Sequence, residues 1–388
     1  MGQSRDAGPI RLVLLTMLMA VGAPATAPAQ TVTTIDSVPD CATCRIEFGQ
    51  PIELRGEFED ASVLGSPASV QVAADGRIYV VYNTDRTSIR VYAPDGSYTG
   101  RIGREGEGPG EFRWIRYIRV DGDVIHAFDW HQLRMTDIDR RTGAVIRTVL
   151  LPDHWRSLSL ADGRTVLGGA VKTRQAIGQP LHMFDAEGTW QRSFGVDEPA
   201  FRPRLEPLFN RYLAAAGPSM FWAAPVNEYR IELWHADGRL LRTLVLEREW
   251  FERWTQYPMP SRDTPPATRL WGLTMGPRGY LWTLFTAAAE DWADAMEDIT
   301  TNREGGPRLV LKEGANYMVN ILEAIDPEDG TLLARLRFEE NPGIFSFAGP
   351  NPVVKIWHDS NDLPRLQVVP VHLVGLPDTM PDGGTGTR

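Results

Sequence analysis

The chain has 388 residues, a formal net charge of −10 and a hydrophobic content of 43%. Its sequence pI is near 5.3, which argues against a phosphate-binding surface, so we exclude nucleic acid as a partner. The length is ample for a large domain with its own core. Only three of the basic residues are lysines (Lys172, Lys312 and Lys355) and the rest are arginines, which we attribute to coding bias, with carboxylate recognition as the alternative.

The N-terminus has the pattern of a secretory signal peptide. Arg5 and Arg11 precede an apolar run over residues 12–20, and Ala27-Pro28-Ala29 fits a cleavage site. The apolar run is too short to span a membrane comfortably. We therefore predict a signal peptide over residues 1–29 and a periplasmic or secreted protein that has no transmembrane segment after cleavage.

The predicted N-terminal tail, residues 30–44, contains the only two cysteines, Cys41 and Cys44. Arg45 stands where haem attachment would need a histidine, and the chain has no second C-x-x-C motif to complete a zinc site. In an oxidising compartment the pair is expected to form a local disulfide that holds the tail near the following strand. A reactive dithiol is the alternative.

Residues 69–112 contain the clearest structural unit, four short strands in succession. Val70 and Val72 alternate with polar residues, and Ile78, Val80 and Tyr82 share one face of the second strand. Asp75-Gly76 and Pro94-Asp95-Gly96 are turn sequences that separate strands. Such an antiparallel sheet cannot bury both faces alone, so it must stack on similar sheets.

Weaker copies of this unit follow. The turn at Gly96 recurs at Gly143, Gly188, Gly238 and Gly330, at intervals of 47, 45, 50 and 92 residues. The first three intervals fit a propeller blade, and the last fits one blade with an insertion, assigned to residues 286–317 of blade five. The segment at 45–58 lacks partners nearby, whereas the last apolar run, residues 365–374, lacks a fourth strand.

These observations predict an all-β fold over residues 45–376: a six-bladed β-propeller of four-stranded antiparallel blades. Pairing the N-terminal strand into the last blade would close the ring and remove an exposed sheet edge. Seven blades are the alternative, if the insertion contains a blade. The turn-rich tail, residues 377–388, is predicted to be disordered.

The glycine-rich run at 103–112, GREGEGPGEF, follows the first unit. Together with the turns and strands of that unit, it resembles the NHL-type six-bladed β-propeller proteins of bacteria. The resemblance covers about residues 45–374 and implies the fold, but that fold carries scaffolds, sensors, lyases and lactonases. The run is not a nucleotide loop, because strand residues rather than a helix follow it and its three glutamates would repel phosphate.

Two segments have helical patterns. Trp250, Trp254 and Tyr257 are spaced i, i+4 and i+7, which predicts an aromatic helix between blades four and five: a lid, a partner surface or a packed cap. Residues 287–299 of the insertion favour a helix with Trp292 and Met296 on one face together with Ile299. Strands are expected to follow at 309–311 and 317–321.

The chain has one close cluster of histidine and aspartate. His126, Asp129 and His131 fall within six residues, but strand alternation places His126 and Asp129 on opposite faces. Convergence on a metal ion is therefore not expected.

Chemistry in propellers is expected at the mouth of the central channel, where the innermost strands begin. Those strands should start near Gly65, Glu111, His154, Asn210, Arg269 and Asn341, a set that is poor in oxygen ligands. The leading hypothesis is an exported, monomeric, non-catalytic scaffold without a cofactor that binds a protein, peptide or glycan. Candidate binding residues, of the types that anchor interfaces, are Arg113, Trp114, Arg116, Trp250 and Trp254.

An enzyme is the alternative hypothesis. Glu111, Asn210 and Asn341 could hold a divalent cation such as Ca²⁺ if they converge at the channel mouth. The protein would then be a metal-dependent hydrolase or lyase, similar to the propeller lactonases.

Overall fold

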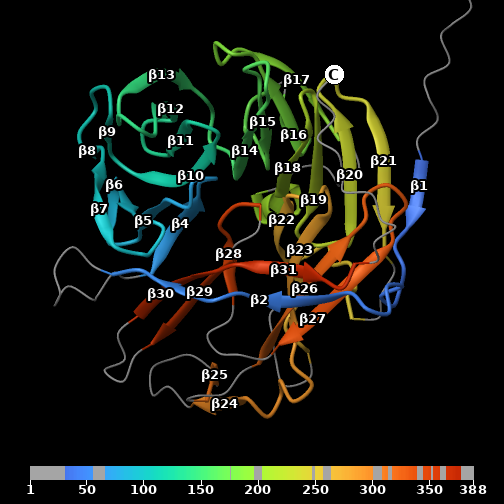
Figure 1. The fold of residues 1–388 in the computed structure, drawn as a ribbon. Coiled ribbons are helices and arrows are strands. Elements are labelled where there is room, and N and C mark those ends of the chain that lie inside the picture. The colour runs from blue at the N-terminus through green and yellow to red at the C-terminus, as the bar shows by residue number, and fades with distance from the viewer. Residues whose placement is uncertain are drawn as a thin grey trace, which may run out of the picture.

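The structure is a computed structural model that describes residues 31–55, 66–174, 176–195, 203–246, 250–256, 264–299, 308–312, 317–338, 344–350, 353–358 and 364–376. The predicted all-β class is confirmed, since the only helix in these ranges is the 3₁₀ helix η1 (Pro203–Phe209). Six blades, each of four antiparallel strands, are arranged as a propeller, and the sheet of one blade gains a fifth, parallel strand (Figure 1). The predicted signal peptide and C-terminal tail lie outside the described residues.

Each blade runs from an innermost to an outermost strand. Blade one contains β4 (Pro67–Val72), β5 (Ile78–Tyr82), β6 (Asp85–Tyr92) and β7 (Tyr98–Ile102). Blade two contains β10 (Ile115–Asp121), β11 (Val124–Asp129), β12 (Arg134–Asp139) and β13 (Val145–Leu150). Blade three contains β14 (Arg156–Ser159), β15 (Thr165–Gly168), β16 (Leu181–Phe184) and β17 (Trp190–Phe194).

Blade four contains β18 (Arg211–Gly217), β19 (Met220–Pro225), β20 (Arg230–His235) and β21 (Leu240–Val245), and β1 (Thr31–Thr34) pairs parallel with β21. Blade five contains β22 (Arg269–Met275), β23 (Leu281–Ala288), β26 (Met318–Ile325) and β27 (Leu332–Phe338). Blade six contains β28 (Ile344–Phe347), β29 (Val353–His358), β30 (Pro364–Val369) and β3 (Ile52–Glu53).

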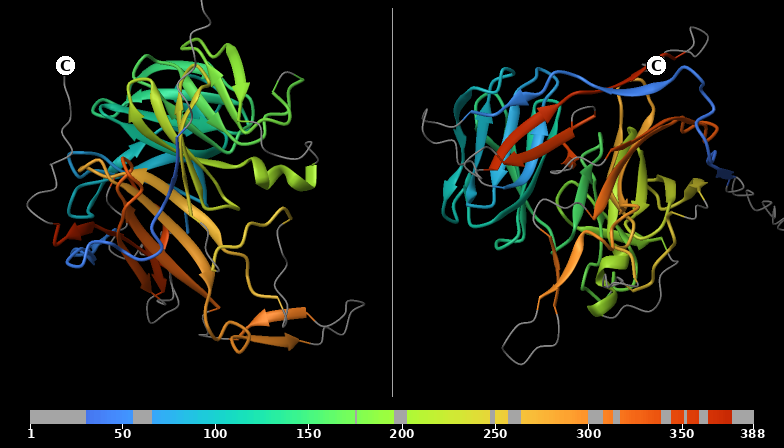
Figure 2. Two further views of the ribbon diagram at one scale, coloured as in Figure 1. Left: turned by 90° about the vertical axis from the view of Figure 1, so that its right-hand side faces the viewer. Right: turned by 90° about the horizontal axis from the view of Figure 1, so that it is seen from below.

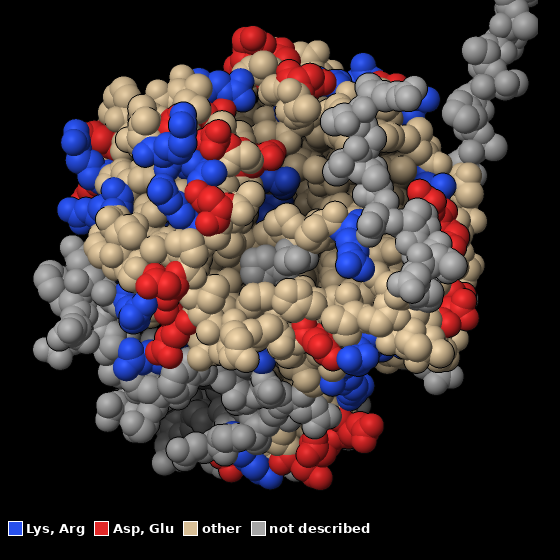
Figure 3. All heavy atoms as spheres, viewed as in Figure 1, with Lys and Arg blue, Asp and Glu red and all other residues tan. Residues whose placement is uncertain are grey.

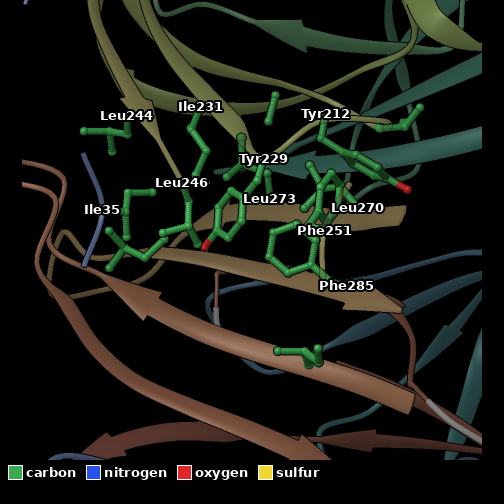
Figure 4. Close-up of a cluster of buried hydrophobic side chains, with 14 of the residues drawn as sticks. Ile35, Tyr212, Tyr229, Ile231, Leu244, Leu246, Phe251, Leu270, Leu273 and Phe285 are labelled. Atoms are coloured by element: carbon green, nitrogen blue, oxygen red, sulfur yellow. The ribbon is translucent and has the colours of Figure 1, made fainter. Parts of the chain in front are cut away.

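The core is divided among the blade interfaces, and each neighbouring pair of blades shares one apolar cluster. Strand alternation produces this arrangement. Ile78, Val80 and Tyr82 of β5 pack toward blade six, whereas Tyr79 and Val81 pack toward blade two. Figure 4 shows the cluster between blades four and five. A blade is therefore stable only between its neighbours, as expected for stacked repeats.

The N-terminal segment closes the ring, as predicted. Ile52 and Glu53 of β3 pair with Val368 and Gln367 of β30, which gives blade six its outermost strand. Just upstream, β2 (Arg45–Phe48) pairs with β31 (Val371–Val374) as a separate two-stranded sheet. The pairing of chain start with chain end leaves no outer edge on β30 for another chain to join.

Figure 1 is viewed from the face that β2 and β31 cross, here called the closure face. Arginines of the outer strands reach from one blade to a turn of the next: Arg147 donates to Ala186 O at 2.8 Å, and Arg242 to Pro327 O at 2.5 Å. Arg140 likewise pairs with Asp75 across blades one and two, at 2.6 Å. Figure 3 shows basic and acidic side chains interspersed on this face, so many of its charges are matched locally.

Both predicted helices are wrong. Trp250 and Trp254 lie in a non-helical connection, where Thr268 Oγ1 donates to Trp250 O at 2.7 Å and Asn227 Nδ2 donates to Trp254 O at 2.8 Å. These side chains satisfy carbonyls that a helix would have used. In the insertion, β23 extends to Ala288 beside β26, and turns lead to a hairpin of β24 (Met296–Ile299) and β25 (Arg308–Leu311). Strand pairing thus overrides the helix propensity of the segment.

Candidate functional site

The innermost strands of the blades begin on the face opposite the closure face, here called the mouth face. In the two views of Figure 2, η1 and the β24–β25 hairpin project from this side of the molecule. The connections that lead into β10, β14, β18 and β22 all lie here, because each blade's fourth strand ends where the next blade begins. Side chains on this face are therefore held by the ends of rigid strands.

The glycine-rich run leads from blade one into blade two. It contains two short parallel strands, β8 (Arg104–Glu105) and β9 (Glu111–Phe112). The Glu111 carboxylate accepts from Gly108 N at 2.8 Å and from Arg104 Nη2 at 2.7 Å, and these bonds lower its pKa. Arg113 Nη2 lies 3.0 Å from Glu107 Oε1. Both predicted residues thus have partners within or beside the loop.

A row of stacked side chains lies beside this loop and is here called the aromatic row: Arg86, Trp114, His131, Trp130 and Arg116. Arg86 lies over the Trp114 ring at 5.2 Å, and Trp114 stacks on His131 at 5.4 Å. His131 also contacts Trp130 at 5.4 Å, and Arg116 lies over Trp130 at 5.9 Å. Trp114 is 37% exposed and Trp130 is 41% exposed, so the row presents large aromatic surfaces to solvent.

Asp129, which is fully buried, holds the aromatic row in place. Its carboxylate accepts from the backbone amides of Arg113 at 2.6 Å and His131 at 3.0 Å, and from that of Trp114 at 3.3 Å. Gln132 adds its own amide at 3.0 Å. One side chain therefore positions the segments on both sides of the stack.

Arg116 connects the aromatic row to a pocket of about 290 Å³ at the start of blade three. It pairs with Asp153 at 2.7 Å, and both residues line the pocket with His154, Trp155 and Asn210. His154 Nδ1 donates to Pro152 O at 2.7 Å, so its Nε2 accepts from the Tyr117 hydroxyl at 2.5 Å. Burial lowers the pKa of His154 to about 3, which keeps the ring neutral.

A second cavity, of about 460 Å³, occupies the centre of the ring and is lined by the innermost strands of all six blades. Trp155 borders both cavities. The walls near the mouth are aromatic: Trp155 meets Tyr212 edge to face at 4.6 Å, and Trp271 is 37% exposed. This volume is in the range of cavities that bind small molecules.

The charged groups of the central cavity are three arginines, Arg119, Arg156 and Arg269, and one carboxylate, Asp121. Arg156 lies over Trp155 at 4.7 Å, and Arg269 lies over Trp271 at 4.6 Å. Within the described part of the chain, none of the three arginines makes a salt bridge, and the Nε atoms of Arg119 and Arg269 are buried without a hydrogen-bond partner. The cavity therefore carries a net positive charge inside an acidic protein.

The predicted site residues divide into three groups. Trp114 and Arg116 belong to the aromatic row, with Arg113 beside it. Trp254 is only 8% exposed and donates through Nε1 to Thr268 O at 2.9 Å, so its predicted place on a binding face is wrong. Trp250 packs with Phe251 and Phe285 against the same core cluster, because this connection folds inward between blades four and five.

The three residues of the metal hypothesis are not brought together by any contact in the described chain. Glu111 is engaged by Arg104 and the glycine-rich loop, Asn210 lines the 290 Å³ pocket, and Asn341 lies outside the described residues. No group of three or more His, Cys, Asp or Glu side chains could hold a metal ion within the described ranges. The hypothesis of a cation-dependent enzyme stays a prediction.

The sequence placed Arg269 at the channel mouth but did not indicate Arg119, Arg156 or the aromatic side chains of the central cavity. The innermost strands of blades three and five begin at Trp155-Arg156 and Arg269-Leu270-Trp271. Assignment of these strand starts is enough to predict that arginine and tryptophan lie at the channel mouth. The aromatic row was not predicted either. Trp114 and His131 lie in different loops, and the hydrogen bonds of Asp129 to both loops bring the two rings together.

At the N-terminal tail, the structure joins Cys41 and Cys44 in a disulfide. The adjacent Thr43 hydroxyl donates to Gly375 O at 2.6 Å, which links the tail to the end of β31.

Comparisons with known proteins agree with this fold. Residues 54–161 match a family, DUF5128, described as a 6-bladed beta-propeller. A solved structure from Bacteroides fragilis NCTC 9343, named as an exported protein, has a TM-score of 0.56 at 11% identity and covers 89% of this chain and 100% of its own. A member of the DUF4221 family from Bacteroides vulgatus has a TM-score of 0.58 at 9% identity, covering 86% and 99%. No curated protein matches the sequence.

The class of protein is thus a six-bladed β-propeller, with a fold similar to that of these two bacterial structures. At these identities the structural likeness defines the fold and not the function. Membership of the NHL type stays a prediction. Within the described residues, no helix is long and apolar enough to cross a membrane.

Proposed function

We propose that the protein is exported and acts as a non-catalytic binding propeller, which holds a protein, peptide or glycan ligand on its mouth face. The observation that carries the proposal is the aromatic and arginine-rich surface of that face. Trp114, Trp130 and Trp271 are each about two-fifths exposed there, and the surface continues into the central cavity. Tryptophan and arginine are the side chains that most often dominate binding energy.

Rigidity of the site supports binding as its role. Asp129 fixes the aromatic row through several hydrogen bonds, and the Trp155–Tyr212 pair lies where two innermost strands, β14 and β18, begin. A preformed surface loses little conformational entropy when a ligand binds, so more of the contact energy appears as affinity. Export is supported by the sequence of residues 1–29.

The proposal can be tested on arrays of peptides and of neutral and acidic oligosaccharides, probed with the purified protein. The variants Trp114→Ala and Trp271→Ala should weaken binding to the best ligand about tenfold or more. Trp190→Ala is the matched control, because Trp190 is 38% exposed on the outermost strand of blade three, away from the mouth face.

Binding that survives both mouth-face substitutions, or that falls equally with Trp190→Ala, would contradict the proposed surface. Mass spectrometry of the recovered ligand tests the non-catalytic part of the proposal. A ligand of unchanged mass is expected, and a shortened or eliminated product would instead favour the hydrolase or lyase alternative.

A further inference from the structure

The three arginines of the central cavity have no structural role that their contacts explain. Among the described residues, the Arg156 side chain donates only to the neighbouring Trp155 O at 3.3 Å, and Arg269 contacts the Trp271 ring. Other arginines of the chain do have carboxylate partners: Arg140 reaches Asp75 at 2.6 Å, and Arg335 reaches the buried Glu323 at 2.5 Å. Guanidinium groups left without a carboxylate in a cavity are costly unless a ligand supplies one.

Two tyrosines connect the arginines in space. Tyr212 lies within electrostatic reach of both Arg156 and Arg269, and Tyr117 lies within reach of Arg156 and Arg119. Arg156 is 5.9 Å from the Tyr212 ring and 5.7 Å from the Tyr117 ring. The positive charges therefore form one region across blades two to five rather than isolated sites. Asp121, the carboxylate of the cavity, is exposed at the far end of β10.

The walls around this charge define the rest of the ligand. Trp155, Tyr212 and the exposed Trp271 present flat aromatic surfaces, on which a sugar or aromatic ring can lie. The guanidinium fork matches the two oxygens of a planar carboxylate. The cavity of about 460 Å³ extends to Arg269 and the exposed Trp271 at the mouth end of β22, so it can accept a small molecule or the end of a chain.

We infer that the central cavity binds a carboxylate borne on a six-membered ring, with Arg156 and Arg269 as its principal ligands. The inference deepens the proposed function by naming a ligand class, and it rests on the mouth face being the binding face. The same chemistry has two sources: a free ring acid, or an acidic residue such as a uronic acid at the end of a glycan chain.

The test is calorimetric titration of the purified protein with glucuronate, benzoate and trigalacturonate, beside glucose, benzyl alcohol and inorganic phosphate. At least one ring acid should bind about tenfold or more tightly than its neutral counterpart, with affinity falling at high salt. Trigalacturonate binding more tightly than glucuronate identifies a glycan chain as the source. Equal affinity for trigalacturonate and glucuronate identifies a free ring acid as the source.

Variants separate a binding role from a structural one. Arg156→Gln and Arg269→Gln should each weaken binding of the ring acid about tenfold or more. Arg269→Lys should lose less affinity than Arg269→Gln, because lysine keeps the positive charge but lacks the guanidinium fork. Arg101→Gln, at an exposed position of the outermost strand of blade one, is the matched control. The cavity variants should unfold at the same or a higher temperature than the parent, since they relieve repulsion between like charges.

Three results would overturn the inference: acids that bind no better than their neutral counterparts, phosphate that binds as well as the ring acids, or cavity variants that lose stability while keeping affinity. Tight binding of a neutral oligosaccharide or peptide on the arrays, without any ring acid bound in solution, would overturn this inference and leave the proposed function standing.

Discussion

Two buried histidines, His154 and His182, lie in surroundings that exclude the charged imidazolium. Burial lowers the pKa of His154 to about 3 and that of His182 to about 4. His182 Nε2 donates to Gly169 O at 2.9 Å, and Nδ1 accepts from the Ser193 hydroxyl at 2.7 Å. Both imidazole rings are therefore neutral, and in that form their hydrogen bonds stabilise blade three.

These pKa values make the fold sensitive to mild acid. An unfolded chain binds a proton on each histidine near pH 6.5, whereas the folded protein does not until the pH approaches 3 to 4. The stability that His154 contributes is thus complete above pH 6.5 and is lost as the pH falls through this window, by at most about 1.4 kcal/mol per pH unit. His154→Gln should lower stability at neutral pH but flatten this decline.

Urea unfolding at neutral pH and at about pH 4.5 measures the effect. The decline in the free energy of unfolding should be smaller for His154→Gln than for the parent. His372→Gln, at an exposed position of β31, is the control and should keep the parent's decline. An undiminished decline in His154→Gln would show that His154 is not the group that titrates.

At the scale of the element, the N-terminal segment packs directly against the backbone of two glycines, Gly96 and Gly375. Gly96 lies in the β6–β7 turn with φ +82°, and a Cβ there would be 2.2 Å from Glu53 O of β3. Gly375 has φ +77°, and a Cβ there would be 2.0 Å from Thr43 O beside the disulfide. Both positions need the left-handed backbone and the absence of a side chain.

Gly96→Ala should destabilise the protein by about 2–4 kcal/mol, because backbone strain adds to a clash with rigid main chain. Gly279→Ala is the matched control: it has φ +79° with no atom within 4 Å of the added Cβ, so only the backbone cost of about 1 kcal/mol remains. Chemical denaturation of both variants gives the difference. Equal losses would mean that β3 shifts to make room at little cost.

The elements that the sequence predicts well are those fixed by local pattern. Alternation in β5 identified which side chains share a face, and the turn at Gly96 identified a hairpin that recurs along the chain. The failures are segments where distant partners decide the conformation. In the predicted helix 287–299, the first two residues pair with β26 and the last four pair with β25. Asn227 and Thr268 bond backbone carbonyls of the segment around Trp250 and Trp254.

At the scale of the whole molecule, the candidate site depends on contacts that no single segment encodes. The mouth face was predictable, because strand count places the start of every blade on one side, and Trp114 and Arg116 were found by residue type. The central cavity was not predicted, because its charge is a sum over three arginines on three blades. Each looks ordinary in the sequence, and only closure of the ring brings them together.

Closure itself therefore has a testable consequence. Removing residues 31–55 would delete β1, β2 and β3 and expose the hydrogen-bonding edge of β30, while Ile35 and Leu54, each 1% exposed, would leave their clusters. An open edge joins other chains, so the truncated protein should form oligomers or aggregates and unfold at a much lower denaturant concentration. Light scattering after gel filtration, with urea unfolding, measures both effects.

Cys41→Ser/Cys44→Ser is the control for loss of the disulfide alone. That bond links residues three apart in sequence, and in the loop-entropy account so short a loop contributes about 2 kcal/mol. The double variant should therefore unfold somewhat earlier than the parent but elute at the same size, because β3 still pairs with β30. A truncated chain that elutes and unfolds like the double variant would show that blade six is stable with three strands, and that the N-terminal strand covers the ring without closing it.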